Sequence, residues 1–188
     1  MSLKMRASRL ALSVLCLLLI VALFAGFFRL YPLRYFEEIR PAAARADLDL
    51  ALVTALIREE SRFRADAVSS QGAVGLMQLM PTTAHWVAGE MGLEEFETGE
   101  LFEPGLNVKL GCWYLAHLID IFAGEEIVAL AAYNGGTGRV YGWLADETWD
   151  GSVENLEDIP TRETREFVRR VIASRRVYRL MSQVLRWE

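Results

Sequence analysis

Two apolar stretches dominate the hydrophobic pattern of this chain. Residues 11–28 are apolar apart from Ser13, with one break at Gly26, and residues 48–57 are apolar apart from Asp49 and Thr54. A helix that is apolar on every side is buried, either in lipid or in the core of a protein. The pattern therefore predicts an N-terminal hydrophobic helix and, after a short gap, a buried core helix that runs to about residue 63.

The rest of the pattern predicts further helices separated by loops rich in glycine, proline and acidic residues. Pro81 suits the first turn of a helix, Gly124 suits a helix end, and Thr161 suits an N-cap. No sustained alternation typical of strands is present. We predict a mainly α fold, with short β pieces at most, and helices over residues 81–91, 107–123, 125–132, 139–145 and 161–183.

The N-terminal stretch has the features of a membrane anchor. Lys4, Arg6 and Arg9 precede it, and no small-x-small cleavage site follows it. By the positive-inside rule the N-terminus would be cytoplasmic and the rest of the chain exported. We predict a transmembrane signal-anchor over residues 1–30, a juxtamembrane segment over residues 31–46, broken at Pro41, and a single domain over residues 47–188. A cleaved signal peptide is the alternative.

Charge and residue types exclude several other classes of protein. The net charge of −5 argues against a nucleic-acid partner. Cys16 falls in the apolar stretch and Cys112 in the domain, so no internal disulfide is expected. His85 and His117 match no metal-ligand spacing. We expect no metal and no cofactor.

Adjacent carboxylates end the predicted core helix, at Glu59 and Glu60. Burial and the negative end of the helix dipole both disfavour a charged carboxylate, and so raise its pKa. A carboxyl group that stays protonated near neutral pH can act as a general acid. The other interpretation is a solvated helix end, in which these residues pair with Arg62 or Arg64.

Ordered motifs favour the first interpretation. I-R-x-E-S and S-x-x-G-A-x-G-L-M-Q-L-M-P-x-T-A resemble the core of the soluble lytic transglycosylase family, lysozyme-like enzymes that cleave peptidoglycan. The later segments NVKLGCWYL, AAYNGGTGRV and IPTRETREFV resemble the family's remaining motifs, in the same order. The resemblance spans residues 57–168 and implies a lysozyme-like helical domain (α+β in the family's terms). With the N-terminal anchor, it places the domain on the cell-wall side of the cell membrane.

The resemblance also implies roles for particular residues. The position of Glu60 is the family's acid/base. The positions that line the substrate cleft are Ser69, Gln78, Met80, Tyr133 and Glu163. Without the resemblance, each of these residues also has a structural interpretation. Ser69 can cap a turn, Gln78 can brace a loop, and Met80 and Tyr133 can be core residues. Glu163 can stabilise the start of a helix through the helix dipole. The chain departs from the family pattern at Glu59, Ala65 and Phe167.

A single obvious acid fits the route that the resemblance implies. Glu60 protonates the glycosidic oxygen between N-acetylmuramic acid and N-acetylglucosamine, and then deprotonates the sugar's C6 hydroxyl, which attacks to give a 1,6-anhydro product. Asp66 is the nearest further carboxylate in the loop, and its position could be purely structural. The alternatives are a hydrolytic lysozyme (muramidase) and a catalytically inactive, membrane-tethered glycan-binding module. The partners implied are peptidoglycan strands and the membrane, and no protein partner is indicated.

Overall fold

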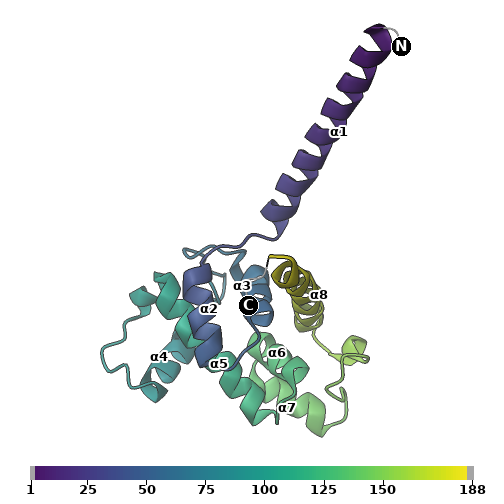
Figure 1. Cartoon of the computed structure of the whole chain (residues 1–188). Coiled ribbons are helices and arrows are strands. Elements are labelled where there is room, and N and C mark those ends of the chain that lie inside the picture. The colour runs from purple at the N-terminus through teal and green to yellow at the C-terminus, as the bar shows by residue number, and fades with distance from the viewer. Residues whose placement is uncertain (1–2, 186–188) are drawn as a thin grey trace. The chain divides into compact units, whose positions relative to one another are not determined.

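The computed structural model describes residues 3–185 and divides into two compact units, one ending at Arg34 and the other beginning at Tyr35. The first unit holds α1 (Leu3–Leu30), which is drawn in purple in Figure 1. Within α1, Leu12–Leu30 form 19 residues with a mean hydropathy of 2.5. This helix is long and apolar enough to cross a membrane, a property that N-terminal signal sequences share.

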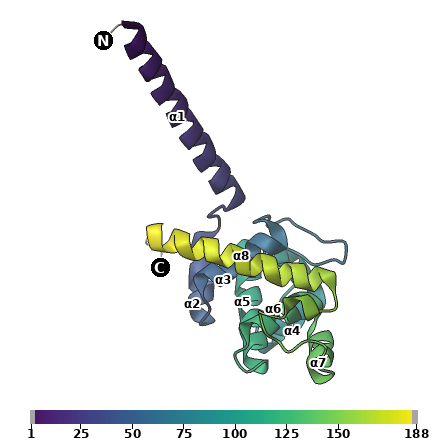
Figure 2. The same ribbon diagram turned by 90° about the vertical axis from the view of Figure 1, so that its right-hand side faces the viewer.

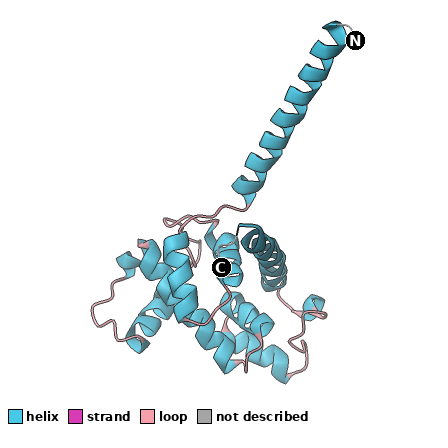
Figure 3. Cartoon of the chain, in the orientation of Figure 1, coloured by secondary structure: helices cyan, strands magenta, loops and turns pink. Residues whose placement is uncertain are grey.

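The second unit is built from helices, and no strand occurs among residues 3–185 (Figure 3). Isolated β-bridges join Val74 to Val68 and to Leu79. The mainly α prediction is confirmed. The helices are α2 (Phe36–Arg45), α3 (Leu50–Ser61), α4 (Pro81–Glu90), η1 (Thr98–Phe102), α5 (Pro104–Ile121), α6 (Glu126–Gly135), α7 (Thr137–Ala145), η2 (Leu156–Asp158) and α8 (Arg162–Leu185).

Helix α2 continues through Pro41, where the sequence predicted a break. Pro41 removes one backbone donor from the helix, which is normally costly in a helix interior. Here Ile39, Ala42 and Ala43 are buried, because α2 packs against α5 and α3, while Pro41 itself faces solvent. The apolar contacts of the buried face offset the missing hydrogen bond.

Two predicted helix ends also differ from the structure. Helix α6 extends through Tyr133 and ends at Gly135, so the predicted loop over residues 133–138 is mostly helical. Gly136, with φ +88°, supplies the left-handed residue between α6 and α7. The Thr161 backbone carbonyl accepts from Arg165 in the first turn of α8, as expected near a helix start. Its hydroxyl, however, is buried and has no hydrogen-bond partner among the described residues.

Helix α3 forms the core of the unit. Its residues from Ala51 to Ile57 are buried, because α8 packs along one side of it and α2 along another. Helix α8 also packs against α6, and Figure 2 shows it lying along the length of the unit. The helix that is apolar all round is therefore enclosed by other helices, as its sequence predicted.

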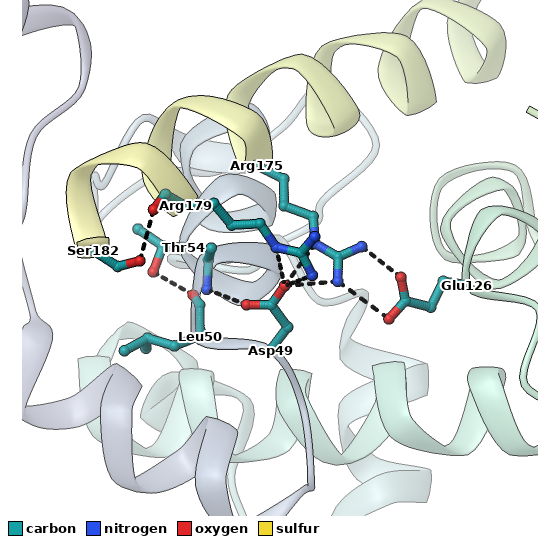
Figure 4. Close-up of polar contacts among 8 residues, drawn as sticks. Asp49, Leu50, Thr54, Glu126, Arg175, Arg179 and Ser182 are labelled. Carbon is teal, nitrogen blue, oxygen red and sulfur yellow. Dashed lines mark hydrogen bonds and ion pairs between the residues drawn. The ribbon is translucent and has the colours of Figure 1, made fainter. Parts of the chain in front are cut away.

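An ion cluster fixes the start of α3 to α8 and α6 (Figure 4). The Asp49 carboxylate is the N-cap, accepting from Ala51 N at 2.9 Å and from Arg175 Nε at 2.8 Å. Arg179 donates to the same carboxylate at 2.7 Å, and Arg175 also pairs with Glu126. Burial alone would raise the pKa of Asp49, but the neighbouring guanidinium groups bring it below its ordinary value. The N-terminus of α3 is thus held in place by charge-assisted bonds.

Candidate active site

A cavity of about 660 Å³ opens at the other end of α3. It collects every predicted site residue, although these come from α3, the loop over residues 62–80, α6 and α8. Their roles remain predictions, but their common location is a property of the fold. The lining comprises Glu60, Ser69, Gln71, Ala73, Gln78, Leu79, Met80, Thr83, Tyr114, Tyr133, Asn134, Gly135, Gly136, Arg139 and Glu163.

Glu60 lies in the last turn of α3, with its carboxyl group in the cavity wall. Arg62 follows in a left-handed conformation, with φ +53°, and ends the helix by donating to Arg58 O. Among residues 3–185, no group donates a hydrogen bond to the Glu60 carboxylate. A carboxylate that is buried and not hydrogen-bonded is poorly stabilised in its charged form.

The pKa of Glu60 is consequently high. Burial is the main cause of the increase. The guanidinium group of Arg170 lowers the pKa and the carboxylates of Glu163 and Glu59 raise it, and the net effect is a pKa that rises from 4.5 to about 8. At neutral pH the Glu60 side chain is therefore mainly a neutral acid, which is the state that general acid catalysis requires.

Glu59 is turned away from the cavity and binds α8. Its carboxylate accepts from Ser174 Oγ at 2.6 Å and from Arg170 Nε at 3.2 Å, and only 7% of its side chain is exposed. The alternative prediction that the helix-end carboxylates pair with Arg62 or Arg64 is wrong for Glu59. The contact with α8 gives Glu59 a structural role and leaves Glu60 as the carboxyl group that lines the cavity.

Ser69 and Gln78 shape the loop while lining the cavity. Ser69 Oγ accepts from Ala73 N at 3.0 Å and from Gln71 N at 3.2 Å, so it caps a turn. Gln78 has φ +47°, and its amide nitrogen donates to Gly75 O at 2.9 Å and Ala67 O at 3.1 Å. Both side chains therefore brace the loop, and each keeps an oxygen that a ligand can reach from the cavity.

Met80 and Tyr133 contribute the apolar part of the wall. Met80 is 39% exposed, so it is not a core residue. The Tyr133 hydroxyl donates to Met77 O at 2.8 Å, which ties α6 to the loop. Burial raises the pKa of Tyr133 well above 10, and the nearby Glu60 raises it further, so Tyr133 stays a neutral phenol. It can accept a hydrogen bond from a ligand but cannot serve as a base.

Asn107 of α5 holds the loop from behind. It is fully buried, accepts from Met77 N at 2.8 Å and donates to Leu101 O at 2.9 Å and Val74 O at 3.0 Å. Gly75 has φ +82°, and a Cβ atom there would lie 2.2 Å from the Asn107 amide nitrogen. Only glycine permits this approach of the loop to α5.

The second carboxylate of the cavity comes from Glu163 in the first turn of α8. Asp66, the other carboxylate considered from the sequence, is exposed and does not line the cavity. The last turn of α6 is joined to the start of α8 by a hydrogen bond of 2.9 Å from Thr164 Oγ1 to Asn134 Oδ1. This bond fixes the distance between the Tyr133 and Glu163 sides of the cavity.

Several lining residues were not singled out from the sequence. Arg139, exposed in the first turn of α7, brings a guanidinium group to the cavity, and Thr83 and Tyr114 extend its wall along α4 and α5. Arg139 and Tyr114 fall inside segments that resemble the family motifs, which was the available signal. Thr83 had the same signal, because it is the threonine of the motif S-x-x-G-A-x-G-L-M-Q-L-M-P-x-T-A.

The structure is a helical domain with a protonated carboxyl group in a polar cavity. This agrees with the lysozyme-like class of protein that the sequence predicted. The chain matches the family model described as "Transglycosylase SLT domain" over residues 37–155, which is more than half of its length. The chain therefore belongs to the transglycosylase SLT domain family, and the predicted resemblance is confirmed. The match begins within α2, the helix that packs against α3 and α5.

Named relatives agree with this assignment. The chain is 34% identical to the soluble lytic murein transglycosylase of Salmonella typhimurium over 151 residues, which cover 79% of this chain and 23% of the relative. It is 35% identical to membrane-bound lytic murein transglycosylase C of Edwardsiella ictaluri over 118 residues, covering 57% of this chain and 32% of the relative. The chain thus spans a quarter to a third of the length of these relatives.

Solved structures show the same fold. An inactive Glu-to-Gln mutant of the lytic transglycosylase Slt from Pseudomonas aeruginosa superposes with a TM-score of 0.74 at 35% identity, covering 83% of this chain and 25% of that one. The 70 kDa soluble lytic transglycosylase of Escherichia coli gives 0.75 at 32% identity, covering 80% and 25%. A solved complex of the 70 kDa soluble lytic transglycosylase with bulgecin A gives a TM-score of 0.74 at 31% identity. The lysozyme-like helical fold expected from the resemblance is confirmed.

The high pKa of Glu60 predicts an unusual dependence of stability on pH. Unfolded Glu60 ionises near pH 4.5, whereas the folded residue stays protonated up to about pH 8. Between these values the unfolded state binds fewer protons, so stability falls as pH rises, and the resulting cost, a few kcal/mol, persists at higher pH. Glu60→Gln removes this cost.

We therefore expect Glu60→Gln to melt above the wild type at pH 7.5 and at nearly the same temperature at pH 4. Calorimetry of both proteins across this range measures the difference. A difference that is the same at both pH values would contradict the raised pKa.

Proposed function

We propose that this protein is a peptidoglycan lytic transglycosylase that cleaves the β-1,4 bond between N-acetylmuramic acid and N-acetylglucosamine and leaves 1,6-anhydro ends. The observation that carries the proposal is Glu60, a carboxyl group with a pKa of about 8 in the wall of a polar cavity. Relatives named as lytic murein transglycosylases support the substrate class. The inactive Glu-to-Gln mutant of the P. aeruginosa relative supports a glutamate acid.

In the proposed reaction the Glu60 proton passes to the glycosidic oxygen as the C1–O bond breaks. The substrate's N-acetyl carbonyl stabilises the cation that develops at the anomeric carbon. Glu60, now a carboxylate, takes the proton of the C6 hydroxyl as that oxygen bonds to C1. The proton count balances, and no water is consumed. The cost of an ionised Glu60 in its buried position favours return of the proton.

The other lining groups would hold the sugar. Ser69, Gln78 and Tyr133 offer oxygens that can accept from hydroxyl and amide groups, and Met80 offers an apolar surface for a ring face. The Arg139 guanidinium group can donate hydrogen bonds to the lactyl carbonyl of N-acetylmuramic acid. This combination of a few placed polar groups with apolar surface is typical of small-molecule sites.

A second candidate is hydrolysis, in which water replaces the C6 hydroxyl as in a muramidase. The presence of Glu163 in the same cavity favours it, because glycosidases that hydrolyse their substrates use paired carboxylates. The single protonated acid, with a partner that is solvent-exposed, fits the transglycosylase better. An inactive glycan-binding module would have no use for an acid that is buried at a cost in stability.

Mass spectrometry of peptidoglycan digested by the purified full-length protein in detergent tests the proposal. We expect muropeptides that end in 1,6-anhydro-N-acetylmuramic acid. Reducing ends would instead identify a hydrolase, and the absence of any product would identify a binding module.

We further propose that α1 anchors the protein in the cell membrane, with its N-terminus in the cytoplasm and the second unit on the cell-wall side. The apolar Leu12–Leu30 segment and the membrane-bound relative support this. The mature protein should remain in the membrane fraction with its N-terminal residues intact. N-terminal sequencing that finds a start between residues 25 and 30 would show that the segment is a cleaved signal peptide.

A further inference from the structure

A buried ion pair lies between α3 and α8, directly beside Glu60. The Glu59 carboxylate accepts hydrogen bonds from Ser174 Oγ at 2.6 Å and from Arg170 Nε at 3.2 Å, and its side chain is only 7% exposed. Glu59 immediately precedes Glu60 in α3. The Arg170 guanidinium group is therefore bonded to one carboxylate and acts through its charge on the next.

The charge of Arg170 works against the proposed role of Glu60. A guanidinium group within roughly 4 to 6 Å of a carboxyl group stabilises the carboxylate and lowers its pKa by about 1 to 3. The Arg170 side chain is 53% exposed, so it has room to change conformation. If its guanidinium group bonded Glu60, this residue would be ionised at neutral pH and could not protonate a glycosidic oxygen.

The other titratable groups that face Glu60 come from α5, α6, α7 and α8. Two of them are phenols that burial keeps neutral, and two are exposed charged groups whose fields are screened by solvent. They are Tyr114, Tyr133, Arg139 and Glu163. The buried charge that bonds Arg170 directly is the Glu59 carboxylate.

The orientation of the Glu59 carboxylate is fixed by bonds to both of its oxygens. Its Oε1 atom accepts from Ser174 and from Arg58, and its Oε2 atom accepts from Arg170. Ser174 follows Arg170 by four residues, so both lie on the face of α8 that meets α3. The Oε2 atom is thus held toward Arg170 by bonds that do not involve that arginine.

We propose that Glu59 is a positioning residue for Glu60, because its carboxylate keeps the Arg170 guanidinium group on the α8 side of α3 and away from the Glu60 carboxyl group. This inference rests on the proposed function, since it takes Glu60 to be the general acid. Without the Glu59 charge, Arg170 turns toward Glu60 and stabilises it as a carboxylate. The pKa of Glu60 then falls, and less of the acid is protonated at neutral pH.

Carbon-13 NMR titration of the glutamate carboxyl groups in the full-length protein in detergent tests the proposal. The Glu60 signal is assigned by its loss in Glu60→Gln. We expect Glu59→Gln to lower the pKa of Glu60 from about 8 by about one unit. Because the neutral acid is the active form, the fall of activity at high pH should move to lower pH by the same amount, with little loss at about pH 6.

Arg170→Gln is the second variant, and it changes a side chain that is more than half exposed. It should raise the pKa of Glu60, and Glu59→Gln should have a smaller effect in this background than in the wild type. Glu126→Gln is the matched control, because Glu126 also pairs with an arginine of α8, Arg175, but does not line the cavity. It should leave the pKa of Glu60 unchanged.

A Glu60 pKa that does not fall in Glu59→Gln would overturn the proposal, as would a fall of equal size in Glu126→Gln. A fall of equal size with and without Arg170 would also overturn it, since Glu59 would then act through its own charge alone. The titration needs no turnover, so the two proposals fail separately. The expected pKa changes in a protein that cleaves nothing support the hold of Glu59 on Arg170 and overturn the proposed enzyme, whereas cleavage with an unchanged pKa overturns the positioning role alone.

Discussion

Glu60→Gln should lower the turnover of purified peptidoglycan by about a hundredfold to ten-thousandfold, the usual contribution of general acid–base catalysis. Glutamine has the size of glutamate but can neither deliver the proton nor take it back. The fold should survive, because no described hydrogen bond depends on the Glu60 carboxylate. Release of soluble muropeptides by wild-type and variant protein measures the effect.

Glu59→Gln is the matched control for this experiment, since it makes the same chemical change one residue earlier in α3. Glu59 contacts Ser174 and Arg170 rather than the cavity, so we expect activity within about tenfold of the wild type and a modest loss of stability. The assignment of Glu60 is wrong if its variant stays within that range, or if Glu59→Gln is the inactive protein.

Asn107→Ala should lower the free energy of unfolding by several kcal/mol. The substitution leaves a buried N–H of Met77 and buried carbonyls of Val74 and Leu101 without their partner, and each such group costs about 1 to 3 kcal/mol. It also opens a cavity behind the loop that carries Gln78, so activity should fall with stability. Urea titration followed by circular dichroism measures the unfolding free energy.

Asn155→Ala is the control, because Asn155 is exposed and its amide nitrogen donates to Asp150 in a surface loop. We expect a change of no more than about 1 kcal/mol for this variant. A loss at Asn107 no larger than the loss at Asn155 would show that the loop is held by other contacts.

The sequence by itself determined the elements whose cause is local. The apolar run over residues 48–57 specifies a buried helix, and the structure has this helix, with Asp49 as its N-cap. Pro81 starts α4, and glycine with positive φ follows α5 and α6, as their conformational preferences require. The order of the motifs identified the family, and with it the residues that line one cavity.

Only the tertiary structure showed which of two adjacent carboxylates packs against another helix and which one lines the cavity. Adjacent residues on a helix point about 100° apart, and hydrophobic periodicity alone cannot say which of Glu59 and Glu60 faces the cavity. Only the resemblance to the family favoured Glu60. Helix α8 decides which carboxylate faces the cavity, because its Arg170 and Ser174 side chains donate hydrogen bonds to the Glu59 carboxylate.

The same holds for the hydrogen bond from the Tyr133 hydroxyl to the Met77 carbonyl, and for the hydrogen bond from Thr164 to Asn134 that joins α8 to α6. Each joins segments far apart in the chain. Hydrophobic periodicity reports that a face is buried but not which segment covers it. Only the packing of the helices against one another sets that choice.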